Sequence, residues 1–383
     1  MMKRLPLFGG LAVLALSVAL TGCDPDKGKP TDTAPGVKPG PAGDSAPVKP
    51  AGETKNPASA FNTARKATGP VLIRVITNGS DPFWDTMGSG LQDGLKTVQA
   101  DPDSKWLPPQ GTDNNSQKSV FEQQKAAKAD GIAVSPIQAE AFSPVIDAAI
   151  DEGIPVITFD SDAPKSKRLA YIGTNNYDAG KVAGEEVVKL FPNGGAFVSF
   201  VGNMSADNAK QRYQGFVDAT KDHKITMLQE PFEDDKDQVG RAHRNVADAI
   251  NKYGDKINGF LGLYAYNGPA IVSEVQKAGI RNKVKIVCFD GVQLTLDNLS
   301  KGLVDIAVVQ KPYEFGRVSA LLLNGINRQG FDAAMKELQP QLEKEGMKVD
   351  MDKHIIDTGV TVVTPKNAVE FIKALHAKGL KST

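Results

Sequence analysis

Two strand patterns that each end in Phe-Asp constrain the fold of this chain most strongly. Ile154–Asp160 and Val284–Asp290 both run mainly through apolar or β-branched residues, with Lys285 as the one charge, before the aromatic and the acid. A short apolar run bounded by turn signals predicts a strand that is buried on both faces of a parallel sheet. In open α/β sheets, ligands bind at the carboxyl ends of the strands. We therefore expect Asp160 and Asp290 to face one site from two similar halves of the molecule.

Strand and helix patterns alternate along most of the chain. Strand patterns begin at Val71–Ile76 and restart at Ala196–Val201, and each is followed by a helix pattern. This alternation favours parallel sheets with helices on both faces. When the first half is shifted by 125 positions, Gly90 falls on Gly215, and the two Phe-Asp strands correspond at a shift of 130. The nearly constant offset predicts two similar Rossmann-like α/β lobes, although any two strand–helix stretches share part of this pattern.

The pattern is less regular after the second Phe-Asp strand. It predicts a strand at Leu303–Gln310 and a helix over about Glu314–Asn327. One further strand is expected over Ile355–Val363, and an amphipathic helix over Asn367–Lys378 closes the chain.

Residues 1–23 have the pattern of an export signal. Lys3-Arg4 precedes an apolar run from Leu5 to Leu20, which is short for a spanning helix, and Leu20-Thr21-Gly22-Cys23 follows. This segment resembles a bacterial lipobox, in which Cys23 becomes the lipid-modified first residue. The alternative is an ordinary signal peptide with an incidental cysteine. Asp24 then resembles the signal that retains lipoproteins at the inner membrane.

Residues 24–69 are rich in Pro, Gly, Ala, Lys and Thr. Such a segment has too little apolar surface for a core and predicts a disordered tether. We expect acyl chains on Cys23 to anchor an exported protein at the periplasmic face of the inner membrane. In an organism with a single membrane, the protein would lie at the outer face of the cell membrane.

Composition excludes several functional classes. The formal net charge is +0 and no long basic run is present, so nothing indicates nucleic acid binding. The histidines lack metal-ligand spacing, and we expect neither a metal nor a cofactor. Gly88, Gly90 and Gly94 lie within an expected helix, where their spacing is wrong for a dinucleotide-binding turn. Cys288 lies in mid-strand and is expected to be a small buried side chain.

Polar and aromatic residues gather at the expected carboxyl ends of the strands. Aromatic rings can cover the CH-rich face of a sugar, while Asp, Asn, Arg and Gln bind its hydroxyls. Each net hydrogen bond contributes about 1 kcal/mol, or about 1.5–3 kcal/mol with a charged partner, so several in a dry cleft would support micromolar binding. The residues are Thr77, Asn78, Asp81, Phe83, Trp84, Asp160, Ser161 and Asp162 in the first half, and Asn203, Asp207, Asn208, Arg212, Tyr264, Tyr266, Asn267, Asp290 and Gln310 in the second.

These motifs together resemble the type I periplasmic binding proteins of sugar ABC transporters, the ribose- and galactose-binding group. The resemblance covers most of the chain from Val71 onward. It rests on the segments Ile76-Thr77-Asn78-Gly79-Ser80-Asp81-Pro82-Phe83-Trp84, Asn208-Ala209-Lys210-Gln211-Arg212-Tyr213-Gln214-Gly215-Phe216, Asn267-Gly268-Pro269-Ala270 and Phe289-Asp290-Gly291, together with Asp160 and Gln310.

The resemblance implies two lobes that close around a small sugar and a closed form that docks on a permease. The protein is expected to be a monomer that binds no nucleic acid. Ser161 and Asn208, at the same strand ends, complete the expected contact set. The implied substrate-binding residues are Asp81, Phe83, Trp84, Asp160, Ser161, Asn208, Arg212, Asn267, Asp290 and Gln310.

The family pattern also implies domain boundaries. Residues 70–173 and 311–350 are expected in the N-terminal lobe, and residues 174–310 and 351–383 in the C-terminal lobe. The three hinge crossings would lie near Thr174–Asn175, near Gln310–Lys311 and around residue 350.

One position departs from the family pattern. Ribose-binding proteins carry Arg after the first-lobe aspartate, whereas this chain has Ser161 followed by Asp162. The missing base and the extra acid change the balance of donors and acceptors and argue against ribose itself. Trp84 offers a broad stacking platform, which favours a six-membered ring.

Three functions remain to be compared. The first is a lipid-anchored, substrate-binding subunit of a sugar importer. The second is a sensory or chemoreceptor-type receptor of the same fold for a sugar or an autoinducer. The third is an enzyme, because sugar-cleaving enzymes also use two carboxylates and Asp160 and Asp290 could form such a pair. The lipobox, the tether and the repeated lobes favour capture without turnover, so we do not expect an enzyme.

Overall fold

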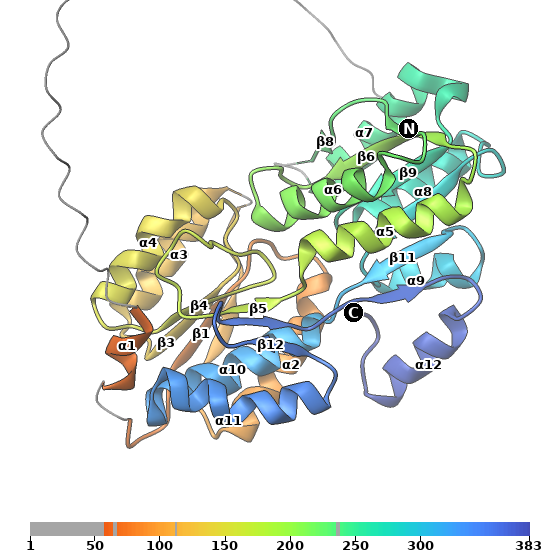
Figure 1. The fold of residues 1–383 in the computed structure, drawn as a ribbon. Coiled ribbons are helices and arrows are strands. Elements are labelled where there is room, and N and C mark those ends of the chain that lie inside the picture. Colours follow the sequence, from red (N-terminus) through yellow and green to blue (C-terminus); the bar gives the residue numbers. More distant parts are fainter. Residues whose placement is uncertain (1–56, 64–66, 112, 235–237) are drawn as a thin grey trace, which may run out of the picture. The chain divides into compact units, whose positions relative to one another are not determined.

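Two seven-stranded sheets organise this computed structural model, which describes residues 57–63, 67–111, 113–234 and 238–383. These residues belong to one compact unit. The expected signal peptide (1–23), Cys23 and most of the expected tether (24–69) lie outside the described residues. Figure 1 shows the two sheets in two lobes. Within the described ranges, no helix combines the length and the apolar character that crossing a membrane requires.

The first lobe contains a sheet with the strand order β12-β13-β5-β4-β3-β1-β2. Neighbouring strands are parallel except β12 and β13. Helices α2 and α10 pack together, as do α3 and α4. The strands are β1 (Ile73–Ile76), β2 (Lys105–Leu107), β3 (Gly131–Val134), β4 (Val156–Phe159), β5 (Tyr171–Gly173), β12 (Lys348–Asp350) and β13 (Ile355–Asp357). The helices are α2 (Phe83–Thr97), α3 (Asn114–Ala126), α4 (Ala139–Asp151), α10 (Pro312–Gln329) and α11 (Phe331–Lys344).

The second lobe has the strand order β14-β11-β10-β9-β6-β7, with β8 also pairing with β6. Only β14 runs antiparallel to its neighbour. The strands are β6 (Gly195–Val201), β7 (Ile225–Met227), β8 (Phe232–Glu233), β9 (Gly259–Gly262), β10 (Lys285–Phe289), β11 (Ile306–Val309) and β14 (Thr361–Val363). The helices are α5 (Asn176–Leu190), α6 (Asp207–Thr220), α7 (Gln238–Tyr253), the 3-10 turn η1 (Gly254–Lys256), α8 (Asn267–Lys277), α9 (Gln293–Ser300) and α12 (Ala368–Ala377).

The two lobes repeat one topology. Five parallel strands follow the order β2-β1-β3-β4-β5 in the first sheet and β7-β6-β9-β10-β11 in the second. The two strands that precede the Phe-Asp motifs, β4 and β10, occupy equivalent places. Every residue of β4 and all but the first residue of β10 are buried, as expected for strands covered on both faces. The predicted repeat of two Rossmann-like lobes is confirmed.

Glycines at equivalent positions allow one helix pair in each lobe to pack closely. A Cβ atom at Gly90 of α2 would lie 1.9 Å from the carbonyl oxygen of Tyr313 in α10. A Cβ atom at Gly215 of α6 would lie 2.1 Å from the carbonyl oxygen of Tyr177 in α5. Because only glycine permits this backbone approach, the match of Gly90 with Gly215 reflects shared helix packing.

The crossings between the lobes run close together. The backbone N–H of Thr358 donates to the Gly173 carbonyl at 2.7 Å, and the N–H of Asn175 donates to Asp357 Oδ1 at 3.0 Å. The chain therefore passes between the lobes beside Gly173–Asn175 and again after Asp357. Between β11 and α10 it passes through Gln310–Lys311.

Two expectations for the end of the chain are wrong. We expected one strand over 355–363 and a crossing around residue 350, but β13 pairs with β5 in the first sheet and β14 pairs with β11 in the second. The third crossing therefore lies between these two strands. Gly359 has a φ of +70°, and its N–H donates to Asp357 Oδ1 at 2.9 Å. This left-handed glycine turns the chain where the apolar pattern alone predicts an uninterrupted strand.

The expected disordered tether also ends earlier than residue 69. Pro57–Asn62 forms a short helix, α1, which packs on α10 and α11. Ala58 and Phe61 are buried, because a spacing of three residues places both on one helix face. Asn62 Nδ2 donates to Asp332 Oδ2 at 2.6 Å, and the Asp332 N–H donates to Asn62 Oδ1 at 2.9 Å. These contacts fix α1 to the first lobe.

Candidate functional site

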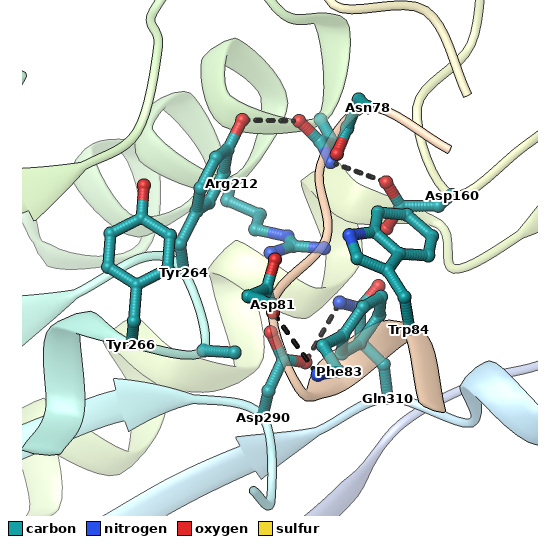
Figure 2. A pocket seen from close by; sticks show the side chains of 12 residues that line it. Asn78, Asp81, Phe83, Trp84, Asp160, Arg212, Tyr264, Tyr266, Asp290 and Gln310 are labelled. Atoms are coloured by element: carbon teal, nitrogen blue, oxygen red, sulfur yellow. Dashed lines mark hydrogen bonds between the residues drawn. The ribbon is translucent and has the colours of Figure 1, made fainter. Parts of the chain in front are cut away.

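A polar pocket lies where the carboxyl ends of both sheets meet. It encloses about 320 Å³ of space, including its opening to solvent. Figure 2 shows side chains from both lobes converging on it. The lining residues are Asn78, Asp81, Phe83, Trp84 and Asp160 from the first lobe, Asn208, Arg212, Tyr264, Ala265, Tyr266 and Asp290 from the second, and Gln310 from a crossing.

The structure brings eight of the expected substrate-binding residues to this pocket: Asp81, Phe83, Trp84, Asp160, Asn208, Arg212, Asp290 and Gln310. Ser161 and Asn267 lie outside its lining. Asn78, Tyr264 and Tyr266 stand at strand ends in the sequence and join the lining here. Ala265 has no polar or aromatic group that would mark it as a ligand contact, and only its position between Tyr264 and Tyr266 points to the pocket.

Asp160 and Asp290 share a backbone conformation as well as a place in the fold. Their φ angles are +58° and +68°, in the left-handed region. Each N–H still donates to the next strand, from Asp160 to Ile172 at 3.1 Å and from Asp290 to Val308 at 2.9 Å. Left-handed residues other than glycine cost about 1 kcal/mol, and acids and amides tolerate the conformation best. Both strands therefore end in the same turn, which supports the same role for both carboxylates.

Arg212 is the only lysine or arginine in the lining of this pocket, and it is 1% exposed. Its Nε donates to Asn176 Oδ1 at 2.8 Å, and its Nη1 donates to the Leu263 carbonyl at 2.9 Å. The guanidinium lies over the Phe289 ring at 4.8 Å. Nη2 has no hydrogen-bond partner among the described residues. The protein thus holds the guanidinium rigidly and leaves a buried donor for another molecule.

Gln310 and Asp290 form a second polar unit. Gln310 Nε2 donates to Asp290 Oδ1 at 2.9 Å, and both residues are buried. Within the described part of the chain, Gln310 Oε1 has no hydrogen-bond partner. A buried amide oxygen without a partner costs about 1–3 kcal/mol, so a ligand hydroxyl that donates to it would be stabilised.

Burial makes the carboxylates hard to ionise. It raises the pKa of Asp160 to about 7, although the nearby Arg212 lowers that pKa. It raises the pKa of Asp81 to about 6, against a hydrogen bond from the Phe83 N–H that lowers it. The pKa of Asp290 is also raised by burial, and Arg212 again opposes the rise. Part of the negative charge of this site is therefore neutralised near pH 7.

Aromatic rings form the walls of the pocket. Trp84 is 2% exposed and meets Phe83 edge-on, with ring centroids 4.9 Å apart. It also meets Phe159 edge-on at 5.9 Å. Tyr264 and Tyr266 form a similar edge-on pair at 6.2 Å. These contacts fix the Trp84 indole in place as a wall of the pocket.

Asn267 binds other protein groups. Its Nδ2 donates to Asp234 Oδ2 at 2.6 Å, and its Oδ1 accepts the Tyr264 N–H at 2.9 Å. Asn267 and Asp234 are fully buried. The sequence expectation missed this because Asp234 is distant in the chain.

Ser161 and Asp162 lie outside the lining, so they do not change the donors and acceptors of the pocket as the sequence suggested. Ser161 is buried outside the lining, and its hydroxyl has no partner among the described residues. Asp162 forms an ion pair with Arg168, with Nε–Oδ1 at 2.5 Å, and also accepts from the Thr158 hydroxyl. The extra acid is therefore neutralised within the first lobe.

The described residues contain no group of three or more His, Cys, Asp or Glu side chains that could hold a metal ion. Cys288 is buried in β10, and burial raises the pKa of its thiol. This matches the expectation of a small core side chain.

Comparisons with known proteins agree with this geometry. The model of the family described as "Periplasmic binding protein domain" matches residues 74–339. A D-ribose/D-allose-binding protein of Pseudomonas aeruginosa is 26% identical over 311 residues, which cover 77% of this chain and 89% of that protein. Its name, like those of the ribose import binding proteins that also match, describes a binding protein and not an enzyme, in agreement with the prediction for this chain.

Solved structures show the same fold. XylFII is 27% identical with a TM-score of 0.66, covering 77% of this chain and 99% of that one, and a XylFII-LytSN complex matches similarly. GanP, a glucose-galactose binding protein from Geobacillus stearothermophilus, is 25% identical with a TM-score of 0.65, covering 78% of this chain and 99% of that one. Because the family model spans more than half of the chain and the two-lobed fold agrees, this chain belongs to the periplasmic binding protein family.

Proposed function

We propose that this chain is the substrate-binding subunit of an ABC importer and that it captures one neutral monosaccharide between its lobes. The observation that carries the proposal is the grouping of three carboxylates around a single guanidinium in a pocket with aromatic walls. Sugar-binding relatives of the same fold support it. The proposed contacts are Asp81, Phe83, Trp84, Asp160, Arg212, Asp290 and Gln310.

The balance of donors and acceptors favours a polyol. Asp81, Asp160, Asp290 and Gln310 Oε1 offer mainly acceptors, whereas Arg212 Nη2 is a buried donor. A ligand that satisfies this set needs several hydroxyls, because each hydroxyl can donate to one group and accept from another. Trp84 would cover an apolar ring face.

The charge of the pocket argues against acidic ligands. Three carboxylates face one guanidinium, so a uronic acid or a sugar phosphate would add a further buried negative charge. Burying an unpaired charge costs several kcal/mol, more than one added hydrogen bond returns. A neutral sugar should therefore bind far better than the corresponding uronic acid.

The transport role rests on the relatives and on the expected N-terminus. Ribose import binding proteins are among the matching relatives. In this proposal, acyl chains on Cys23 tether the protein at the membrane, and the sugar-bound lobes present a composite surface to the permease. Replacing Cys23 with serine should release the protein from the membrane fraction, and retention there would contradict lipidation at this residue.

A sensory role is the second candidate. One matching structure is a XylFII-LytSN complex, so a protein of this fold binds a partner, LytSN, whose name is not that of a permease. Both roles share the same sugar site, so the pocket does not separate them. Copurification with an ABC permease or with a sensor protein, using the membrane-bound full chain, would distinguish the two partners.

A thermal-shift screen tests the ligand class. The chain from residue 24 would be heated with neutral hexoses, pentoses, polyols, uronic acids, amino acids and nucleosides. A ligand at 100 times its Kd adds about 2.7 kcal/mol, which raises the melting temperature by several degrees. We expect one or a few neutral sugars to do so. A shift with an acidic sugar or an amino acid alone would refute the proposed ligand class.

A further inference from the structure

A direct hydrogen bond joins the two lobes inside the pocket. Asn208 Nδ2, on the second-lobe helix α6, donates to Asp160 Oδ2 of the first lobe at 3.2 Å. Both residues are 3% exposed. The sequence suggested Asn208 as a sugar contact, but this contact already uses its amide nitrogen on the opposite lobe.

Tyr264 holds the Asn208 amide from within the second lobe. The Tyr264 hydroxyl donates to Asn208 Oδ1 at 3.1 Å, and the dashed lines between Tyr264 and Asp160 in Figure 2 mark both bonds. The amide oxygen accepts from one side and the amide nitrogen donates to the other. A rotated amide would turn its oxygen towards the Asp160 carboxylate and lose that bond, so the nitrogen faces Asp160 and the oxygen is left to accept from Tyr264.

A buried polar network holds Tyr264 in turn. The Tyr264 N–H donates to Asn267 Oδ1, and Asn267 Nδ2 donates to Asp234 Oδ2. Asp234 Oδ1 accepts from Asn245 Nδ2 at 2.6 Å. The turn that carries both pocket tyrosines is therefore anchored to the interior of the second lobe, and Asn267 acts through Tyr264.

The first-lobe side of the contact is equally well defined. Ser135 Oγ donates to Asp160 Oδ2 at 3.0 Å, and Asn78 Nδ2 donates to Ser135 Oγ at 3.1 Å. Ser135 and Asn208 thus both use Oδ2 of Asp160. Oδ1 is the oxygen that this arrangement leaves for a ligand.

We propose that Asn208 and Tyr264 form a cross-lobe clasp that favours lobe closure and reserves Asp160 Oδ1 for the ligand. In this role Asn208 and Tyr264 are positioning residues. The effect of the clasp on sugar affinity rests on the proposed function, but its effect on lobe closure does not.

The chain offers a built-in probe of closure. It contains two tryptophans, and Trp84 lines the pocket at 2% exposure. Replacing Trp106 with phenylalanine leaves Trp84 as the only indole. When the lobes separate, acrylamide gains access to Trp84 and quenches its fluorescence. The measurement uses the purified full chain without added sugar.

Loss of one neutral hydrogen bond of about 1 kcal/mol shifts an opening equilibrium by roughly fivefold. In the Trp106→Phe background, Asn208→Ala and Tyr264→Phe should both increase the quenching of Trp84 by acrylamide. Tyr253→Phe is the matched control, because Tyr253 donates to Gln229 Oε1 at 2.8 Å within the second lobe and lies outside the pocket. It should leave the quenching unchanged.

Tyr264→Phe alone decides the proposal if Asn208→Ala does not fold, because it keeps the aromatic ring and removes only the hydroxyl. Quenching that stays at the level of the Tyr253→Phe control would overturn the clasp. If a sugar binds the unmodified chain, Tyr264→Phe should also weaken its Kd about fivefold. If no sugar binds, the proposed function fails, whereas the quenching experiment still tests the clasp.

Discussion

Replacing Asp160 with asparagine should stabilise the protein and weaken its ligand binding. Burial raises the pKa of this carboxyl from 3.8 to about 7, so its ionisation opposes folding. That difference in pKa corresponds to roughly 4 kcal/mol at high pH. Asparagine carries no charge and tolerates the left-handed backbone at φ +58° as well as aspartate does. Its amide oxygen can still accept from Ser135 and Asn208.

The sign of the pH dependence follows from the raised pKa. Asp160 is neutral in both the folded and unfolded chain below pH 3.8, so it contributes no penalty there. As the pH rises towards about 7, the unfolded chain loses this proton first and the folded state becomes less stable. The advantage of Asp160→Asn should therefore be small at pH 4 and grow to at most about 4 kcal/mol by pH 8.

Guanidinium chloride unfolding from pH 4 to pH 8 measures this effect. Trp84 lies in α2 and Trp106 in β2, and Asp160 directly follows β4 of the same lobe, so tryptophan fluorescence reports the relevant lobe. Asp255→Asn is the control, because the Asp255 side chain is 88% exposed. A destabilised Asp160→Asn variant, or an advantage that does not change with pH, would refute the reasoning. The same variant should bind sugar at least about tenfold more weakly, because a charged acceptor is lost.

Three further predictions concern the pocket and the packing of the first lobe. Sugar affinity should fall as the pH is lowered from 8 to 5, because ligand hydroxyls donate to ionised carboxylates. Burial raises the pKa of Asp160 to about 7 and that of Asp81 to about 6, so both carboxylates gain protons in this range. Calorimetric titration across this range would show a flat profile if the carboxylates were not contacts. Gly90→Ala should lower the free energy of unfolding by about 1–3 kcal/mol or more, because the new methyl group meets the Tyr313 carbonyl. Gly69→Ala is the control, because a methyl group there has open space. Equal unfolding midpoints for the two variants would contradict the close helix packing. Phe61→Ala removes a buried ring worth about 3 kcal/mol and should detach α1, which amide hydrogen exchange over residues 58–62 would detect as lost protection.

The sequence pattern predicted the features that depend on local repetition. Asp160 and Asp290 could be paired because each follows an apolar strand and an aromatic residue, and strands of this kind end at one edge of a parallel sheet. Trp84 and Arg212 could be placed because they stand in the loop or the first helical turns after a strand. Local order in the chain fixes which edge of the sheet such residues occupy.

Features that depend on distant partners could not be predicted in this way. Asn267 stands at a strand end like its neighbours, but its partner Asp234 lies 33 positions away and directs its amide into the interior. The apolar pattern of 355–363 does not reveal that Gly359 turns the chain between two sheets. Docking of α1 similarly depends on Asp332, 270 positions from Asn62.

The place of α10 in the chain also sets which lobe can assemble first. The parallel strands of the second sheet, β6 to β11, come from one continuous stretch of the chain, 195–309. The first lobe, by contrast, must recruit α10, which contacts β1, β3, β4 and β5 from far along the chain. Because closing longer loops costs more entropy, the second lobe should form its core earlier during folding. Until α10 arrives, the first sheet exposes apolar strands, so this lobe is the one at risk of aggregation when folding is slow.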